Sequence, residues 1–199
     1  MNLIICKDSS EVVTKTNEWC KRVLKNSDSL FLPTGNTPLP IYENWEKTRP
    51  EFLNNKQLIQ LDEIVTGVRA KSFWAFLKEK LPSYINQVIP VQKAQKPAKA
   101  AILGLGLNGH IAFHEPGVPD DFYKGEVPLS ALTRTNLKLE DGTKGHSFGL
   151  KAILECQSIL LIIRGQNKKE IYQRFLDKDI SLPAVKLMNH PDFTVLKET

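Results

Sequence analysis

An apolar run at residues 101–105, ending among closely spaced glycines, is the feature that most constrains the fold. A short run of this kind, free of charged residues, is typical of a strand buried on both faces of a parallel sheet. Glycines stand at positions 104, 106 and 109, and they let the chain turn sharply and bring backbone N–H groups close to a ligand. The stretch therefore predicts a parallel strand whose carboxyl end carries a site.

Similar units recur along the chain, each an apolar run, a polar or glycine-containing loop and a segment with helical spacing. We expect strands at residues 3–6, 30–32, 57–61, 101–105, 129–133, 158–163 and 193–196. We expect helices at residues 9–25, 39–47, 71–80 and 148–155, with a last one ending near 176, and a connector at 88–99. The alternation predicts an α/β fold, a three-layer sandwich around a mostly parallel sheet, in a single domain spanning residues 1–199.

Composition narrows the class of protein. The formal charge of +5 favours anionic partners, but the basic residues are scattered and no aromatics alternate with them, which argues against nucleic-acid binding. Three widely separated cysteines suggest neither a disulfide framework nor a metal site, and they fit a reducing cytoplasm. No apolar stretch approaches the roughly 18 residues of a membrane helix, so we expect no membrane partner.

Two loops are candidate anion sites. Residues 34–37, Thr34, Gly35, Asn36 and Thr37, precede a helix that starts near a proline, so their free N–H groups and the helix dipole could hold a phosphate. Lys168, with Gly165 before it, follows another predicted strand and could reach a phosphate from the first turn of a helix, the alternative being an ordinary solvated lysine. The alternative for the first loop is a plain helix cap. The full phosphate-loop and dinucleotide motifs are absent, so no nucleotide cofactor is indicated.

Proton-transfer candidates follow two other strands. His110 lies two residues after Asn108 and five residues before Glu115, so an amide and a carboxylate could orient its imidazole. Asp62 ends another predicted strand and could act as a general base if burial raised its pKa. The alternative for Asp62 is an ordinary solvated turn. Zinc is not expected, because the order of the histidines and the glutamate is not that of a zinc-binding helix.

Four stretches together resemble the glucosamine-6-phosphate deaminase/isomerase family, which shares its Rossmann-like fold with the 6-phosphogluconolactonases. They are PTGNTPLPIY at 33–42, LDEIVTG at 61–67, LGLGLNGHIAFHEPG at 103–117 and IIRGQNKK at 162–169. These stretches occur in the family's order and span most of the chain. IAFHEP is similar to the deaminase IAFNEP, whereas lactonases resemble GEDGHTAS at this loop.

The resemblance implies a role for each matched residue. Asp62 would move a proton between C2 and C1 of the opened amino sugar, and His110 would open the ring with the support of Glu115 and Asn108. The groups that would hold substrate and its 6-phosphate are Thr34, Gly35, Asn36, Thr37, Gly109 and Lys168. Ammonia and a ketose 6-phosphate would be the products. The resemblance implies no metal or organic cofactor, a cytoplasmic enzyme, a sugar-phosphate partner and possible homo-oligomers.

Three alternatives stay open from the sequence. The first is a 6-phosphogluconolactonase-type hydrolase, and the second is a sugar-phosphate-binding module without turnover. The third concerns the epimer: Asn108 stands where glucosamine-6-phosphate deaminases have aspartate, which is more similar to the galactosamine-6-phosphate branch. Arg134 and Lys138 are candidates for the lid cation that the family places on phosphate.

Overall fold

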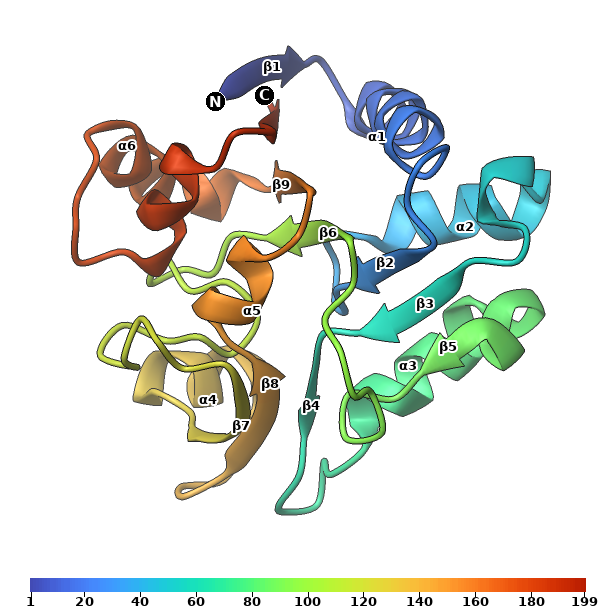
Figure 1. The fold of residues 1–199 in the computed structure, drawn as a ribbon. Coiled ribbons are helices and arrows are strands. Elements are labelled where there is room, and N and C mark those ends of the chain that lie inside the picture. Colours follow the sequence, from blue (N-terminus) through green and yellow to red (C-terminus); the bar gives the residue numbers. More distant parts are fainter.

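A seven-stranded parallel sheet forms the centre of the molecule in the computed structural model, which describes residues 1–199 (Figure 1). Its strands are β1 (Asn2–Cys6), β2 (Ser29–Leu32), β3 (Gln57–Gln60), β5 (Val88–Ile89), β6 (Ala100–Gly104), β9 (Ser158–Ile163) and β10 (Phe193–Glu198). Across the sheet the order is β1-β10-β9-β6-β2-β3-β5, and every neighbouring pair is parallel. The predicted parallel sheet is confirmed.

Helices cover both faces of this sheet. The helices on one face are α1 (Ser9–Val23), α2 (Leu39–Thr48) and α3 (Ser72–Lys80), with the 3-10 turns η1 (Glu51–Leu53) and η2 (Pro82–Gln87). Those on the other are α5 (Leu150–Leu154), α6 (Lys169–Leu176) and the 3-10 turn η4 (Pro183–Asn189). Each set packs on its own buried cluster, so the predicted three-layer sandwich is confirmed. None of the helices is both long and apolar enough to cross a bilayer.

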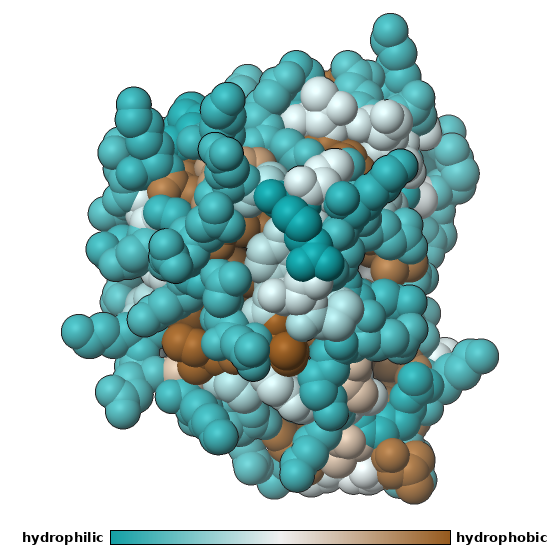
Figure 2. Space-filling view, turned by 90° about the vertical axis from the view of Figure 1, so that its right-hand side faces the viewer, coloured by the Kyte–Doolittle hydropathy of each residue, from teal (hydrophilic) through white to brown (hydrophobic).

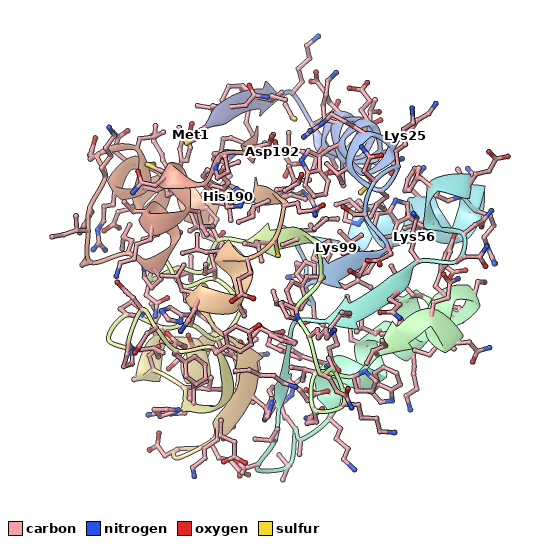
Figure 3. The ribbon with its side chains drawn as sticks, in the orientation of Figure 1. Met1, Lys25, Lys56, Lys99, His190 and Asp192 are labelled. Atoms are coloured by element: carbon pink, nitrogen blue, oxygen red, sulfur yellow. The ribbon has the colours of Figure 1, made fainter.

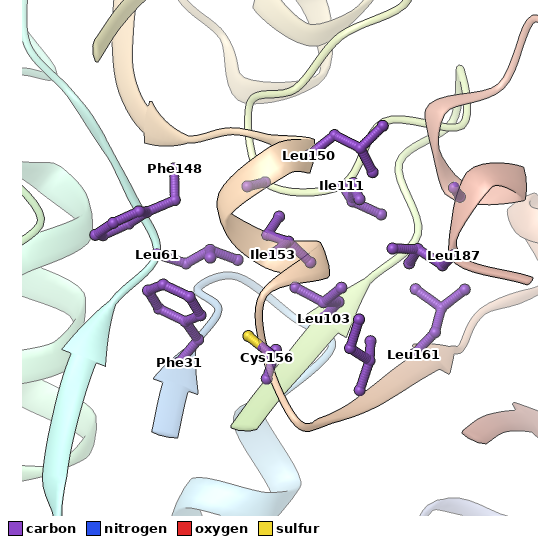
Figure 4. Close-up of a cluster of buried hydrophobic side chains, with 14 of the residues drawn as sticks. Phe31, Leu61, Leu103, Ile111, Phe148, Leu150, Ile153, Cys156, Leu161 and Leu187 are labelled. Atoms are coloured by element: carbon purple, nitrogen blue, oxygen red, sulfur yellow. The ribbon is translucent and has the colours of Figure 1, made fainter. Parts of the chain in front are cut away.

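Strand β9 shows how the sequence builds this core. All six of its residues are buried, and successive side chains of a strand point to opposite faces. Ile159, Leu161 and Ile163 pack in the cluster beneath α5 and α6, whereas Leu160 and Ile162 pack beneath α1 and α2. Figure 4 shows the first cluster, where Leu161 is drawn with apolar side chains of neighbouring strands. Each fully buried side chain of this size contributes about 1.5–3 kcal/mol.

A smaller antiparallel sheet joins the carboxyl end of the large one. It consists of β4 (Asp62–Ile64), β8 (Lys144–Phe148) and β7 (Lys124–Pro128), in the order β4-β8-β7. The chain passes from β3 into β4 through Leu61, whose N–H donates to Leu32 and whose carbonyl accepts from Phe148. Asp62, predicted to end the preceding strand, and Glu63 therefore lie inside a strand of their own.

One sequence prediction is wrong in this region, and the bounds of another differ from the structure. Residues 129–133 do not form a strand: β7 ends at Pro128, and helix α4 (Ala131–Leu137) follows, capped by the Ser130 hydroxyl, which accepts from the Thr133 N–H. The helix expected at 148–155 begins only at Leu150, because Phe148 pairs with Lys124 in the small sheet. The connector at 88–99 also contains the short strand β5 at its start.

The chain reverses its direction of travel across the sheet between β2 and β6. These strands are neighbours, but β2 continues to β3 on one side and β6 continues to β9 on the other. The loops that follow them therefore diverge and leave a crevice at their carboxyl ends, which is where ligands bind in open α/β sheets. The opposite end is marked by Lys56, Lys99 and Asp192, which precede β3, β6 and β10 (Figure 3).

The outer surface over α1 and α2 lies away from that crevice and is mostly polar (Figure 2). Figure 2 shows a mostly hydrophilic face there, with hydrophobic residues in small separate patches. Single exposed apolar residues of this kind are normal on a protein surface. This face therefore shows no large apolar patch that would indicate a binding surface (Figure 2).

Candidate functional site

A cleft of about 530 Å³ opens at the carboxyl ends of β2 and β6. Its walls come from loops that are far apart in the sequence. Of the residues predicted for the site, those that line it are Thr34, Gly35, Asn36, Thr37, Asp62, His110 and Lys168. The structure thus brings together the two predicted anion loops, the predicted base and the predicted histidine.

The loop of residues 34–37 is open to a ligand. None of its four backbone N–H groups donates a hydrogen bond within the protein. The loop leads through Pro38 into α2, so the positive end of the helix dipole adds to these donors. Gly35 has φ of +88°, a left-handed conformation that favours glycine. Such a turn of free amides is suited to binding a phosphate group.

Lys168 approaches the same loop from β9. It ends the 3-10 turn η3 (Gln166–Lys168), which follows Gly165 at the carboxyl end of that strand. Burial lowers the pKa of its amino group, and no carboxylate offsets this effect. A half-buried ammonium without a counter-ion is stabilised when an anion binds beside it. The cleft therefore contains a cation that is prepared for an anionic ligand.

Asp62 is the most perturbed carboxylate of the chain. Only 6% of the residue is exposed, and its Oδ1 has no hydrogen-bond partner. Burial raises its pKa to about 8, and the neighbouring charge of Glu63 acts in the same direction. A carboxyl group whose pKa lies near neutrality can take up and release a proton under physiological conditions. The solvated-turn alternative for Asp62 does not hold.

His110 faces the cleft with two polar groups behind it. Its Nδ1 lies 3.3 Å from the Thr133 hydroxyl and 3.5 Å from Glu115 Oε2. Its backbone N–H donates to Asn108 Oδ1 at 3.2 Å. The geometry holds Nδ1 toward the protein and leaves Nε2 as the nitrogen available to a ligand.

Glu115 is buried behind the histidine and stays ionised. Burial works to raise its pKa, but hydrogen bonds with His110, Thr133 and Asn108 and the charge of His110 lower it to about 2. The shortest of its contacts is with the amide of Asn108, whose Nδ2 donates to Oε2 at 2.6 Å. Glu115 and Asn108 therefore lie behind His110 and do not line the cleft.

The glycines of the histidine loop serve close packing. A Cβ at Gly106 would lie 2.3 Å from the ring of His110, so only glycine lets the imidazole lie against the backbone here. Gly109 was predicted to contact substrate, but it does not line the cleft. It packs against Leu182, and its carbonyl accepts from the Ala184 N–H. Its position is explained by the packing of the loop on η4.

The two predicted lid cations lie outside the cleft. Arg134 donates to the Leu129 carbonyl and pairs with Asp141, and Lys138 ends α4. The sequence reasoning missed two charged residues that do line the cleft, Arg164 and Glu198. Arg164 directly follows the apolar strand β9, and a charged residue at the carboxyl end of a buried strand was the signal that could have found it.

Known proteins resemble this chain in sequence and in fold. Glucosamine-6-phosphate deaminases of Streptococcus pneumoniae strains 70585 and TIGR4 are 32% identical to it over 206 aligned positions, which cover 89% of this chain and 87–88% of theirs. A solved structure of a monomeric glucosamine-6-phosphate deaminase has a TM-score of 0.83 at 24% identity, covering 100% of this chain and 97% of that one. No family model matches the chain.

A solved 6-phosphogluconolactonase from Leishmania guyanensis shares the fold as well. Its TM-score is 0.79 at 15% identity, and the match covers 99% of this chain and 96% of that one. The lactonase match establishes the fold alone, whereas the streptococcal sequences match most of both chains at a much higher identity. The chain belongs to the glucosamine-6-phosphate deaminase family.

Proposed function

We propose that the protein, as one domain of residues 1–199, is a cytoplasmic deaminase/isomerase of hexosamine 6-phosphates. It converts galactosamine or glucosamine 6-phosphate to a ketose 6-phosphate and ammonia. The observation that carries this proposal is Asp62, a buried carboxylate with an unpaired oxygen and a pKa of about 8, facing the same cleft as His110 and the free amides of residues 34–37. An acid/base pair beside an anion site fits proton transfer on a phosphorylated sugar.

The phosphate is held at one end of the cleft. The N–H groups of residues 34–37 donate to its oxygens, and the Thr34 and Thr37 hydroxyls are available to add further donors. Lys168 supplies a positive charge, and its ammonium gains a counter-ion when the anion binds. This anchoring fixes the sugar carbons relative to Asp62 and His110, which reduces the entropy lost on reaching the transition state.

His110 opens the sugar ring. The ionised Glu115 behind it favours the tautomer with a proton on Nδ1, so Nε2 carries the lone pair that can accept a proton from the C1 hydroxyl. The same nitrogen then returns a proton to the ring oxygen as the C1–O5 bond breaks. The result is an open-chain aldehyde with its amino group still on C2.

Asp62 carries the proton shift that follows. Its carboxylate removes the proton from C2, which is acidic because it lies next to the aldehyde, and the resulting enolamine is protonated at C1. The C2 ketimine formed in this way adds water and loses ammonia, and a ketone remains. Besides proton transfers the reaction sequence consumes one water and releases ammonia, and it needs no external oxidant or reductant because C1 is reduced as C2 is oxidised, so the proposal requires no metal or organic cofactor.

One assay series tests this function. The protein is incubated with galactosamine 6-phosphate, with glucosamine 6-phosphate and with 6-phosphogluconolactone, and ammonia and lactone loss are measured. We expect ammonia from at least one amino sugar. Lactone hydrolysis without ammonia would support the hydrolase alternative, and binding of the amino sugars without either reaction would support a binding module. The ratio of the two ammonia rates identifies the preferred epimer, for which Asn108 is the candidate determinant.

A further inference from the structure

Arg164 connects three parts of the chain at the back of the anion loop. It lies at the carboxyl end of β9, and 17% of its side chain is exposed. Its Nη1 donates to the carbonyl oxygens of Asn36 at 3.2 Å and Thr37 at 3.1 Å. Its Nε donates to Glu198 Oε2 at 2.9 Å. No other protein group donates to either of the two loop carbonyls.

Glu198 holds the guanidinium in this position. Its other oxygen, Oε1, accepts from the Ser9 hydroxyl at 2.6 Å, and Ser9 also accepts from Arg164. Burial works to raise the pKa of Glu198, but the hydrogen bonds from Ser9 and Arg164 lower it, so the carboxylate stays ionised. The first turn of α1 and the last strand β10 are thereby linked to the loop that follows β2.

We propose that Arg164 is a positioning residue for the anion site, held in place by Glu198 at the end of β10. This inference rests on the proposed function, because it assigns the 34–37 loop to the phosphate of the substrate. The C=O and N–H of one trans peptide point in opposite directions. By fixing the Asn36 carbonyl, Arg164 therefore also fixes the direction of the Thr37 N–H, one of the free donors of the loop.

The loop is anchored differently at its two ends. At its start, the buried Tyr42 hydroxyl of α2 donates to the Pro33 carbonyl at 2.7 Å. At its end, Pro38 has no N–H of its own, so the Thr37–Pro38 peptide can be held only through the Thr37 carbonyl, which Arg164 contacts. Without Arg164 the end of the loop loses its only side-chain anchor, and binding an anion would require ordering the loop first.

Charge alone does not account for this arrangement. The carboxylate of Glu198 neutralises Arg164, and the guanidinium already uses its Nε and Nη1 donors within the protein. Lysine has one ammonium and cannot reproduce a planar set of donors that reaches a carboxylate and two carbonyls at once. The inference therefore predicts that Arg164→Lys, which keeps the charge, loses most of what Arg164→Met loses.

The test measures inorganic phosphate binding by calorimetry, together with hexosamine 6-phosphate turnover. The variants are R164M, R164K, E198Q and the double variant R164M/E198Q. The matched control is R22M, which removes an arginine–aspartate pair at the opposite end of the sheet, where Arg22 contacts Asp192. Thermal unfolding of every variant is recorded in parallel, so that a general loss of stability is separated from a loss of the site.

We expect R164M and R164K to weaken phosphate binding about tenfold and to raise KM for the sugar phosphate by a similar factor, with kcat changed less than threefold. E198Q should act in the same direction, and the double variant should bind phosphate no more weakly than R164M, because the two residues act in one chain of contacts. R22M should leave phosphate affinity unchanged even where its melting temperature falls.

Several outcomes would overturn the inference: phosphate affinity of R164M equal to wild type, full rescue by R164K, or an effect of R22M as large as that of R164M. If R164M does not fold, R164K and E198Q supply the same comparison. The phosphate measurement does not depend on turnover. If phosphate binding depends on Arg164 as expected but the wild-type protein releases no ammonia, the proposed function is contradicted and the inference stands.

Discussion

Asp62 and Glu63 are neighbours on β4, yet their carboxylates have opposite surroundings. Both are buried. Glu63 accepts hydrogen bonds from the backbone N–H groups of Ile64, Phe73 and Trp74 and from the Gln60 amide, whereas Asp62 Oδ1 has no partner. Successive side chains of a strand point to opposite faces, so one carboxylate anchors the start of α3 and the other faces the cleft.

Replacing Asp62 by asparagine should strongly reduce turnover and leave phosphate binding almost unchanged. The amide keeps the shape of the side chain but cannot remove a proton, so we expect the rate of ammonia release to fall by a factor of about 10²–10⁴. Inorganic phosphate affinity should stay within about twofold of wild type. D141N makes the same change at a fully exposed carboxylate and serves as control. Turnover of D62N close to that of wild type would contradict the role of Asp62 as base.

The catalytic rate should depend on the ionisation of the same carboxyl group. Because burial raises the pKa of Asp62 to about 8, a base at this position is mostly protonated at pH 6. We therefore expect log(kcat/KM) to rise with pH with a slope near one between about pH 6 and pH 7, to bend near pH 8 and to level off above it. A profile that is flat across this range would exclude Asp62 as the group that must be ionised in the free enzyme.

Stability should change with pH in the opposite direction. The folded-state pKa of Asp62 is about 8 and its ordinary value is 3.8, so between these values the folded protein holds a proton that the unfolded chain has released. This contribution is fully present below about pH 4 and is lost as the pH rises to 8, at up to about 1.4 kcal/mol per pH unit. Urea unfolding of wild type and D62N at pH 5, 7 and 9 measures this contribution. The free energy of unfolding of D62N, relative to that of wild type, should increase with pH.

The hydrogen bond that the Asn108 amide donates to Glu115 should stabilise the folded protein. In N108D the donating amide becomes a second carboxylate beside Glu115 Oε2, which now accepts from Nδ2 at 2.6 Å. Like charges this close oppose each other, so the pair should retain a proton and unfolding at pH 8 should require about 1–3 kcal/mol less than in wild type. N136D adds a charge to an exposed part of the cleft wall. Equal losses in N108D and N136D would refute a specific contact.

Glu63 should matter for stability rather than for chemistry. E63Q keeps the size of the side chain but replaces one acceptor oxygen by a donor that would face backbone N–H groups. We expect a loss of about 1–3 kcal/mol in the free energy of unfolding. E46Q is the surface counterpart, since Glu46 accepts from the N–H and hydroxyl of the exposed Ser83, and it should lose less. Denaturant titration of both variants decides the matter.

The large sheet could be predicted because each of its inner strands carries its own signal. The run Ile159–Ile163 is apolar throughout, and the structure forms β9 over the expected residues 158–163. The small sheet could not be predicted in this way. β7 reads KGEVP and β8 reads KGHSF, so neither has an apolar run or a clear alternation, and both depend on pairing that the local sequence does not encode.

The candidate site, like the fold, was predictable in one part and not in another. Asp62, His110, Lys168 and the 34–37 loop each follow a predictable strand, so the rule that parallel strands share a carboxyl edge places them together. The packing of Gly109 against Leu182 and the bridge from Arg164 to Glu198 depend on contacts between segments far apart in the chain. Sequence periodicity contains no information about such contacts.

The position of β1 also determines the order in which the molecule can assemble. In the large sheet β1 pairs only with β10, where Asn2 is in register with Thr194. Because β10 follows the other six strands of this sheet along the chain, β1 has no sheet partner during synthesis until all of them have been made. The apolar side chains at this edge are exposed even in the folded protein: Met1, Leu3 and Ile5. During synthesis β1 therefore presents both unpaired backbone groups and apolar side chains to solvent. We expect β1 to join the large sheet no earlier than β10.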